Sequence, residues 1–133
     1  MPKPAQKEIV VHAKTLFSGG RVLSDRWIVV KGDSIVEISA KKQPSDYAGI
    51  VTPAFVDPHS HIGMFRAGEP GGEQEGNDIT HQIQPLCDPI RSIYFDDLAF
   101  VDSIDFGVLY SCIMPGSGNL FGGRSKVIRN FAS

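Results

Sequence analysis

The pattern of apolar residues changes at Thr52, and this change constrains the fold more than any other feature of the chain. Before it, short β-branched runs alternate with turn signals such as "SGGR" at 18–21 and "KGDS" at 31–34. Glycine followed by aspartate at 32–33 suits a tight hairpin. Residues 8–51 are therefore predicted to form antiparallel strands, as a small meander or half of a sandwich.

From Thr52 the pattern is strand, long loop, helix, strand. Residues 63–85 carry glycines and acidic residues with little apolar periodicity, which predicts a loop. Residues 95–107, "FDDLAFVDSIDFG", have acidic residues in the first turn and a terminal glycine, which predicts a helix. "VLYSCIM" at 108–114 predicts a buried strand, and "SKVIRNF" one more. This order favours a parallel β/α arrangement, with domains at 1–51 and 52–133.

His59 and His61 form an H-x-H pair at the end of the apolar run that opens the second half. On a strand, side chains at i and i+2 point to the same face, so that both imidazoles can reach one cation. Asp57 shares that face if Pro58 leaves the register intact. An H-x-H pair also arises by chance, so two polar histidines at a strand end are the alternative interpretation.

The composition excludes several classes of partner. The net charge is -2 and the basic residues are scattered, which argues against a basic field for nucleic acid or anionic lipid. No apolar stretch reaches the length of a signal peptide or a membrane span. Cys87 and Cys112 form no C-x-x-C motif, which suits a reducing compartment. We expect a soluble, cytoplasmic protein without nucleic-acid or membrane partners.

Several stretches together resemble the amidohydrolase superfamily, and more closely its imidazolonepropionase-related members. They are "VTPAFVDPHSHIG", "EGND" at 75–78, "FDDLAFVDSIDFGV" and "MPGSGNLFGG" at 114–123. The resemblance covers nearly the whole chain from about Lys7. It implies an α/β fold, in which N-terminal β-strands of a small composite sandwich precede the first β/α units of an incomplete (β/α)8 TIM-type barrel.

The resemblance also implies metal-dependent hydrolysis of C–N bonds in a small-molecule substrate, cyclic amides among them. The family's first two metal ligands match His59 and His61, at the C-terminal end of the first barrel strand. A divalent metal is implied, zinc first, with iron, manganese or nickel as alternatives. Such a metal lowers the pKa of water and polarises a carbonyl. The family's remaining ligands and its catalytic base have no match in this chain.

The loop "PGSGNLFGG" at 115–123 follows a predicted strand, where a loop at the catalytic face of a barrel would lie. Its glycines can bring backbone amides close to a ligand, but it lacks the lysine of a P-loop. Asn119, Gly122 and Gly123, together with Asp57, are the predicted substrate-contacting or supporting residues. The carboxylates of 68–78 either form a solvated loop or cover the barrel mouth.

Two departures from the family pattern are Ala54, in place of a glycine, and Leu109, in place of a threonine. A complete barrel takes about 250 residues, far more than follow Thr52. The chain is therefore expected to be the front part of a longer enzyme and inactive by itself. The alternative is a non-catalytic remnant or assembly module, whose strand edges pair with another chain, a second copy included.

Overall fold

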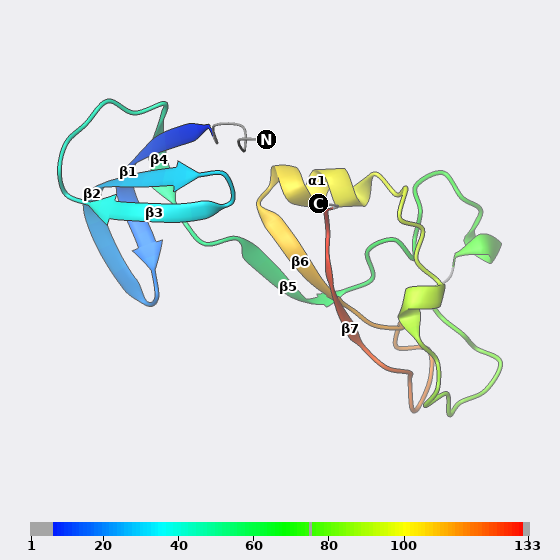
Figure 1. The fold of residues 1–133 in the computed structure, drawn as a ribbon. Helices are drawn as coiled ribbons and strands as arrows, with labels where there is room; N and C mark the ends of the chain where they lie inside the picture. The colour runs from blue at the N-terminus through cyan, green and yellow to red at the C-terminus, as the bar shows by residue number, and fades with distance from the viewer. Residues whose placement is uncertain (1–6, 75, 132–133) are drawn as a thin grey trace, which may run out of the picture. The chain divides into compact units, whose positions relative to one another are not determined.

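The computed structural model describes residues 7–74 and 76–131 of the 133-residue chain. The chain divides between Pro53 and Ala54 into two compact units, and each contains its own sheet (Figure 1). Strands make up most of the regular structure, with few helices. None of the helices in the described ranges is long and apolar enough to cross a membrane.

The first unit is a four-stranded sheet in the order β3-β2-β1-β4. Its strands are β1 (Glu8–Ser18), β2 (Arg21–Lys31), β3 (Ser34–Ser39) and β4 (Tyr47–Val51). The first three form an antiparallel meander, as predicted. Its second turn contains Gly32 at φ 61°, a conformation that suits glycine. The sheet fits the small β-sandwich that the resemblance implies.

The direction of β4 corrects the sequence prediction, because β4 pairs parallel with β1 rather than antiparallel. Residues 40–46 carry the chain back across the sheet, from β3 at one edge to the far side of β1. Asp46 secures this crossing. Its carboxylate accepts the N–H of Val10 at 2.8 Å, and its own N–H donates to the carbonyl of Val10 at 2.8 Å.

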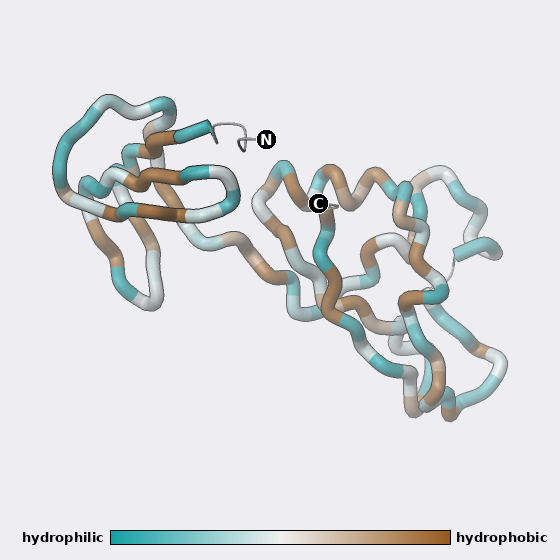
Figure 2. The backbone as a smooth tube through the Cα atoms, in the orientation of Figure 1, coloured by the Kyte–Doolittle hydropathy of each residue, from teal (hydrophilic) through white to brown (hydrophobic). Residues whose placement is uncertain are grey.

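One hydrophobic cluster holds the first unit together. Buried Ala13, Leu16 and Ile28 form its centre. Alternate strand residues point to the same face of a sheet, so Ala13 shares a face with Val11, the residue of β1 that pairs with Ile28 of β2. Partly buried side chains complete the cluster: Val11, Leu23, Val30 and Val51. Figure 2 shows the corresponding apolar stretches along the strands.

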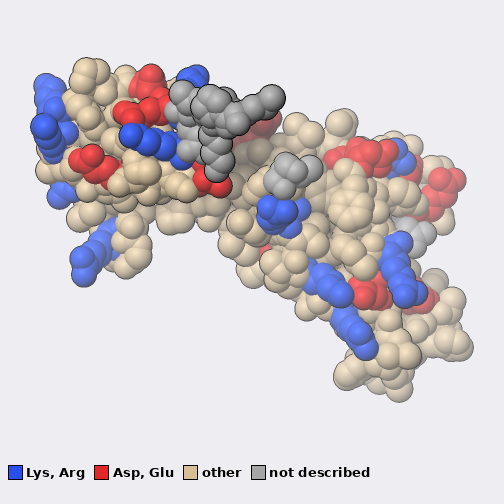
Figure 3. All heavy atoms as spheres, in the orientation of Figure 1, with Lys and Arg blue, Asp and Glu red and all other residues tan. Residues whose placement is uncertain are grey.

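In its described residues, the second unit is a three-stranded sheet, in the order β5-β6-β7, with one α-helix. Its elements are β5 (Phe55–Ser60), the short 3₁₀ turns η1 (Gly71–Glu73) and η2 (Pro89–Arg91), α1 (Ala99–Asp105), β6 (Val108–Ile113) and β7 (Lys126–Arg129). β5 and β6 are parallel and α1 connects them, which makes one β/α unit as predicted. Both units display acidic and basic side chains on the face seen in Figure 3.

Two details of the second unit differ from the sequence prediction. The helix is shorter than 95–107, because Asp97 accepts the N–H of Ala99 at 3.2 Å and residues 95–98 form a turn before the helix. β7 runs antiparallel to β6, because the chain returns beside β6 through a loop instead of a helix. The described sheet thus contains one parallel β/α unit, and it does not by itself amount to a partial barrel.

Candidate functional site

The histidine pair lies at the C-terminal end of β5. The pairing of β5 with β6 shifts register between Asp57 and Ser60. Pro58 lies inside this shift and has no N–H to donate to the neighbouring strand. His59 therefore occupies an irregular strand end, and His61 follows the strand directly.

The structure brings the two imidazoles together. The ring centres of His59 and His61 lie 5.4 Å apart, and the ring planes are nearly perpendicular, at 82°. His59 is exposed and His61 is half-buried. The ring of Phe65 lies edge-on to His61, with centres 5.9 Å apart. The pair thus presents one accessible imidazole beside one whose position is fixed by neighbours.

A backbone carbonyl fixes the orientation of His61. Its Nδ1 lies 2.7 Å from the carbonyl oxygen of Met114, directly after β6. A carbonyl oxygen only accepts hydrogen bonds, so Nδ1 carries the proton and Nε2 carries the lone pair of the neutral ring. Metal-binding histidines commonly have this arrangement, in which one ring nitrogen donates to a carbonyl and the other is left to the metal.

Asp57 stabilises the same strand end through a hydrogen bond to the backbone of His59. Its carboxylate accepts the N–H of His59 at 3.1 Å, a local turn of the kind that aspartate commonly stabilises. This contact lies within the register shift around Pro58. A direct role of Asp57 toward a ligand stays a prediction.

The spacing of the imidazoles fits a shared zinc ion. Two imidazoles on one tetrahedral zinc hold their ring centres about 5 Å apart, since each zinc–nitrogen bond is about 2 Å long. The observed 5.4 Å agrees with this arrangement. Within residues 7–74 and 76–131, no group of three or more His, Cys, Asp or Glu side chains is placed to hold a metal ion. The described chain thus offers two ligands, fewer than the three or four of a complete zinc site.

The predicted residue Asn119 joins two loops. Its Nδ2 donates to the carbonyl oxygens of Asp78 and His81, at 2.5 and 2.7 Å. Backbone bonds between residues 76–84 and 115–123 add to this contact, and we call the whole contact the loop clasp. One example is the N–H of Phe121, which donates to the carbonyl of Gln82 at 3.0 Å. The amide donors of Asn119 are therefore engaged within the protein.

The two predicted glycines of this loop have different surroundings. A Cβ at Gly122 would meet nothing within 4 Å. A Cβ at Gly123 would lie 2.7 Å from the Cβ of Cys87, so only glycine fits there. Contact of either glycine with a ligand stays a prediction, and close packing already explains Gly123.

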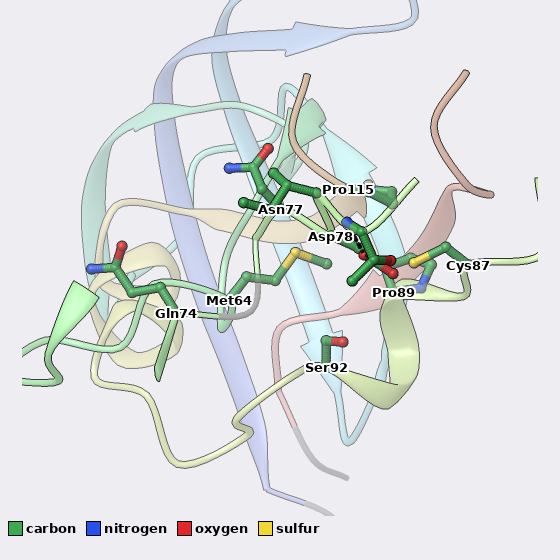
Figure 4. A pocket seen from close by; sticks show the side chains of 10 residues that line it. Met64, Gln74, Asn77, Asp78, Cys87, Pro89, Ser92 and Pro115 are labelled. Carbon is green, nitrogen blue, oxygen red and sulfur yellow. Dashed lines mark hydrogen bonds between the residues drawn. The ribbon is translucent and has the colours of Figure 1, made fainter. Parts of the chain in front are cut away.

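A pocket of about 400 Å³ lies in the second unit, among the loops that follow β5 and β6 (Figure 4). Its lining residues are Met64, Gln74, Asn77, Asp78, Ile79, Thr80, Cys87, Pro89, Ser92 and Pro115. Met64 comes three residues after His61 and its N–H donates to the His61 carbonyl at 3.0 Å. Pro115 follows Met114, whose carbonyl binds His61. The pocket and the histidine pair are thus connected through both loops.

Asp78 is the charged residue of this lining. The hydroxyl and the N–H of Thr80 donate to its carboxylate at 2.5 and 2.9 Å, and Gln84 donates at 3.1 Å. These bonds, that of the Thr80 hydroxyl first, hold the pKa of Asp78 below its ordinary value. Sequence reasoning missed this role, although an aspartate two residues before a threonine is a recognisable turn signal. No comparable sequence pattern indicates that the Met114 carbonyl contacts His61.

The other histidines lie outside the pair. His81 is exposed in the loop clasp. His12 belongs to the first unit, where its ring stacks on Trp27 with centres 4.3 Å apart and its Nε2 lies 3.0 Å from the Asp25 carboxylate. Neither joins His59 and His61 in a cluster of metal ligands among the described residues.

Comparison with known proteins agrees with the sequence resemblance at the level of the superfamily. No protein-family model matches the chain. Amidohydrolase tasK from Hapsidospora irregularis is 28% identical over an alignment of 117 residues, and the match covers 84% of this chain and 12% of that protein. An amidohydrolase from Thermotoga maritima aligns with a TM-score of 0.74 and 28% identity, over 93% of this chain and 34% of that one. The chain resembles amidohydrolases in sequence and in fold.

These likenesses support the amidohydrolase superfamily, and they do not distinguish imidazolonepropionase-related members from others. The chain spans about an eighth of the length of tasK and about a third of the Thermotoga protein. The activity and substrates of a whole amidohydrolase are accordingly a matter of proposal for this chain.

Proposed function

We propose that this chain supplies the first two metal ligands of a metal-dependent amidohydrolase that cleaves a C–N bond in a small molecule. The observation that carries the proposal is the pairing of His59 with His61, in which the Met114 carbonyl leaves Nε2 of His61 available. The likeness to amidohydrolases supports the reaction class. Cyclic amides are the proposed substrates, on the basis of the imidazolonepropionase-like stretch "PGSGNLFGG".

The residues of the chain have separate tasks in this proposal. His59 and His61 bind the cation. Imidazole ligands suit zinc, and also iron and nickel; manganese is a further alternative. A divalent cation there supplies Lewis acidity toward the substrate carbonyl and lowers the pKa of water. Asp57 holds the strand end through the N–H of His59. General-base catalysis requires a positioned base, and we propose that such a group and further ligands come from outside this segment.

The fold supports a further part of the proposal. β5, α1 and β6 form a β/α unit, and the histidines lie at the C-terminal end of its first strand. Active sites of (β/α)8 barrels are built at that end of the strands. We therefore propose that β5–α1–β6 is the opening unit of such a barrel.

The decisive experiment is hydrolysis of a panel of cyclic amides and N-acyl compounds, with and without a chelator. The 133-residue chain and a longer form with further ligands are assayed side by side. We expect chelator-sensitive turnover by the longer form alone, abolished by His59→Ala or His61→Ala. Activity that survives both substitutions would refute the proposal, and turnover by the 133-residue chain would place the catalytic base within it.

A second candidate function is an assembly module that pairs with another chain. The observation in its favour is that β5 is an edge strand of its sheet and that Phe55 and Val56 on it are more than half exposed. Such edges are templates for strand pairing. Sedimentation analysis tests this function. A dimer that Val56→Lys dissociates, in a chain without metal affinity, would favour the module over the enzyme.

A further inference from the structure

We propose that the backbone carbonyl of Met114, held in place by the loop clasp, positions His61 for a divalent cation. This inference rests on the proposed function, in which His61 is a metal ligand. It adds the group that orients this ligand and the residues that hold that group. Met114 and His61 are 53 residues apart in the sequence, so that the loops after β5 and β6 both contribute to one imidazole.

The proton position on His61 decides whether the ring can bind a cation through Nε2. A neutral imidazole carries its proton on one nitrogen and its lone pair on the other. The 2.7 Å contact with the Met114 carbonyl retains the proton on Nδ1. Without that acceptor the proton is free to occupy Nε2, where it blocks the metal-binding lone pair. The carbonyl therefore selects the tautomer before a metal arrives.

The Met114 carbonyl has little freedom to turn away from His61. The N–H of Met114 donates to the carbonyl of Ser60 at 3.1 Å, which continues the pairing of β5 and β6. The preceding residue, Ile113, is fully buried. On the N-terminal side of the Met114 carbonyl, the sheet therefore fixes the position of the chain.

On the other side the loop clasp holds the chain immediately after Met114. The N–H of Gly116 donates to the carbonyl of Gly76 at 2.5 Å, and the N–H of Gly118 donates to Oδ1 of Asn77 at 3.1 Å. Asn119 adds its two bonds to the opposite loop. The clasp therefore determines where the peptide after Met114 lies, and Gly116 and Asn119 are positioning residues.

The loop offers a matched pair of glycines for a test. A Cβ at Gly116 would lie 2.7 Å from Cγ of Asn77 and closer still to the Oδ1 that accepts the Gly118 N–H. Gly116→Ala should therefore displace the Asn77 amide and open the clasp. Gly122→Ala makes the same chemical change in the same loop, at a position with nothing within 4 Å. Asn119→Ala removes two clasp bonds without adding atoms, and it carries the test if Gly116→Ala does not fold.

The first measurement is the tautomer of His61, in the ¹⁵N-labelled 133-residue chain without metal. Protonated and unprotonated nitrogens of a neutral imidazole resonate far apart. The spectra are recorded at a pH of about 9, above the reference pKa of histidine in model peptides. We expect Nδ1 of His61 to be protonated in the wild type and in Gly122→Ala. Gly116→Ala and Asn119→Ala should shift the proton toward Nε2 and leave the ring of His12 unchanged. A merely structural role of the clasp would not move this signal.

The second measurement is a Zn²⁺ titration followed by the ring resonances of His59 and His61. The affinity should fall roughly tenfold or more in Gly116→Ala and Asn119→Ala, and Gly122→Ala should match the wild type. Wild-type His61 protonated on Nε2, or clasp variants with unchanged tautomer and affinity, would overturn the inference alone. Correct tautomers without any response to zinc would overturn the metal function, and the inference with it.

Discussion

Gly123 packs directly against Cys87, because a Cβ at position 123 would lie 2.7 Å from the Cβ of Cys87 and closer still to its carbonyl oxygen. The same oxygen accepts the N–H of Arg124 at 2.9 Å. A side chain at position 123 would therefore force apart two loops whose backbones are in contact. The loop after β6 and the loop before η2 behave as one packed layer at this point.

This contact predicts a difference in stability between neighbouring glycines. Gly123→Ala should lower the free energy of unfolding of the second unit by about 2 kcal/mol, the usual cost of overpacking. A Cβ at Gly122 would lie in open space, so Gly122→Ala should change the free energy of unfolding by less than about 0.5 kcal/mol. Urea unfolding followed through the amide resonances of β6 measures both. Equal stabilities of the two variants would contradict the packing at Gly123.

The backbone conformation of Asp25 predicts a difference in stability between two substitutions in the first unit. Its φ of 48° lies in the left-handed region, and its carboxylate contacts Nε2 of His12. Asp25→Ala should destabilise the unit by about 1 kcal/mol or more, because alanine tolerates this backbone poorly. Asp25→Asn should cost less, because asparagine adopts the left-handed region more readily. Fluorescence of Trp27, the one tryptophan of the chain, follows urea unfolding of this unit. A larger loss in Asp25→Asn than in Asp25→Ala would contradict the backbone argument.

The pKa of Asp78 predicts a pH dependence. Hydrogen bonds from Thr80 lower this pKa in the folded chain, so the stabilisation is present above the unfolded pKa and is lost as the pH falls through the folded value. Thr80→Val should raise the pKa of Asp78 toward its ordinary value, as measured by carboxyl NMR titration. Its stability deficit should be largest near neutral pH and should shrink below about pH 4. Thr80→Ser keeps the hydroxyl and should titrate like the wild type. A deficit that does not vary with pH would contradict this assignment.

The histidine pair predicts the behaviour of the chain toward metals. The 133-residue chain should bind Zn²⁺ weakly, because two ligands are fewer than the three or four of a complete site. His59→Ala and His61→Ala should each lower the affinity at least tenfold. His81→Ala removes an exposed histidine of the same unit and serves as the control. Isothermal titration calorimetry gives the affinities, and an effect of His81→Ala equal to the others would indicate unspecific surface binding.

The sequence was informative wherever a local pattern determines structure. The meander of β1, β2 and β3 follows from β-branched runs and from the glycine turn at Gly32, and both signals act within a few residues. The parallel pairing of β5 and β6 follows from the helix between them, since a parallel connection needs a crossover. The spacing of His59 and His61 likewise predicted their proximity, which the structure shows.

The features that the sequence did not predict depend on contacts between residues that are distant in the chain. The directions of β4 and β7 are set by how a loop returns the chain to its sheet, and loop composition does not encode this. The contact of Asn119 with a substrate stays a prediction, whereas the donation of its amide to backbone carbonyls of another loop had no signal in the sequence. The Met114 carbonyl contacts His61 through a group that every residue type has. No pattern of side chains could therefore have indicated it.

The crossing from β3 to β4 has a consequence for the order of folding. The meander forms from neighbouring segments, whereas the contact of Asp46 with Val10 joins residues 36 positions apart. Closing a longer loop costs more chain entropy, and distant pairings form more slowly than local ones. We expect β4 to dock last during folding and to detach first in native-state hydrogen exchange. Because β4 leads directly into β5, the strand that docks last in the first unit is the one that precedes the histidine-carrying strand in the sequence.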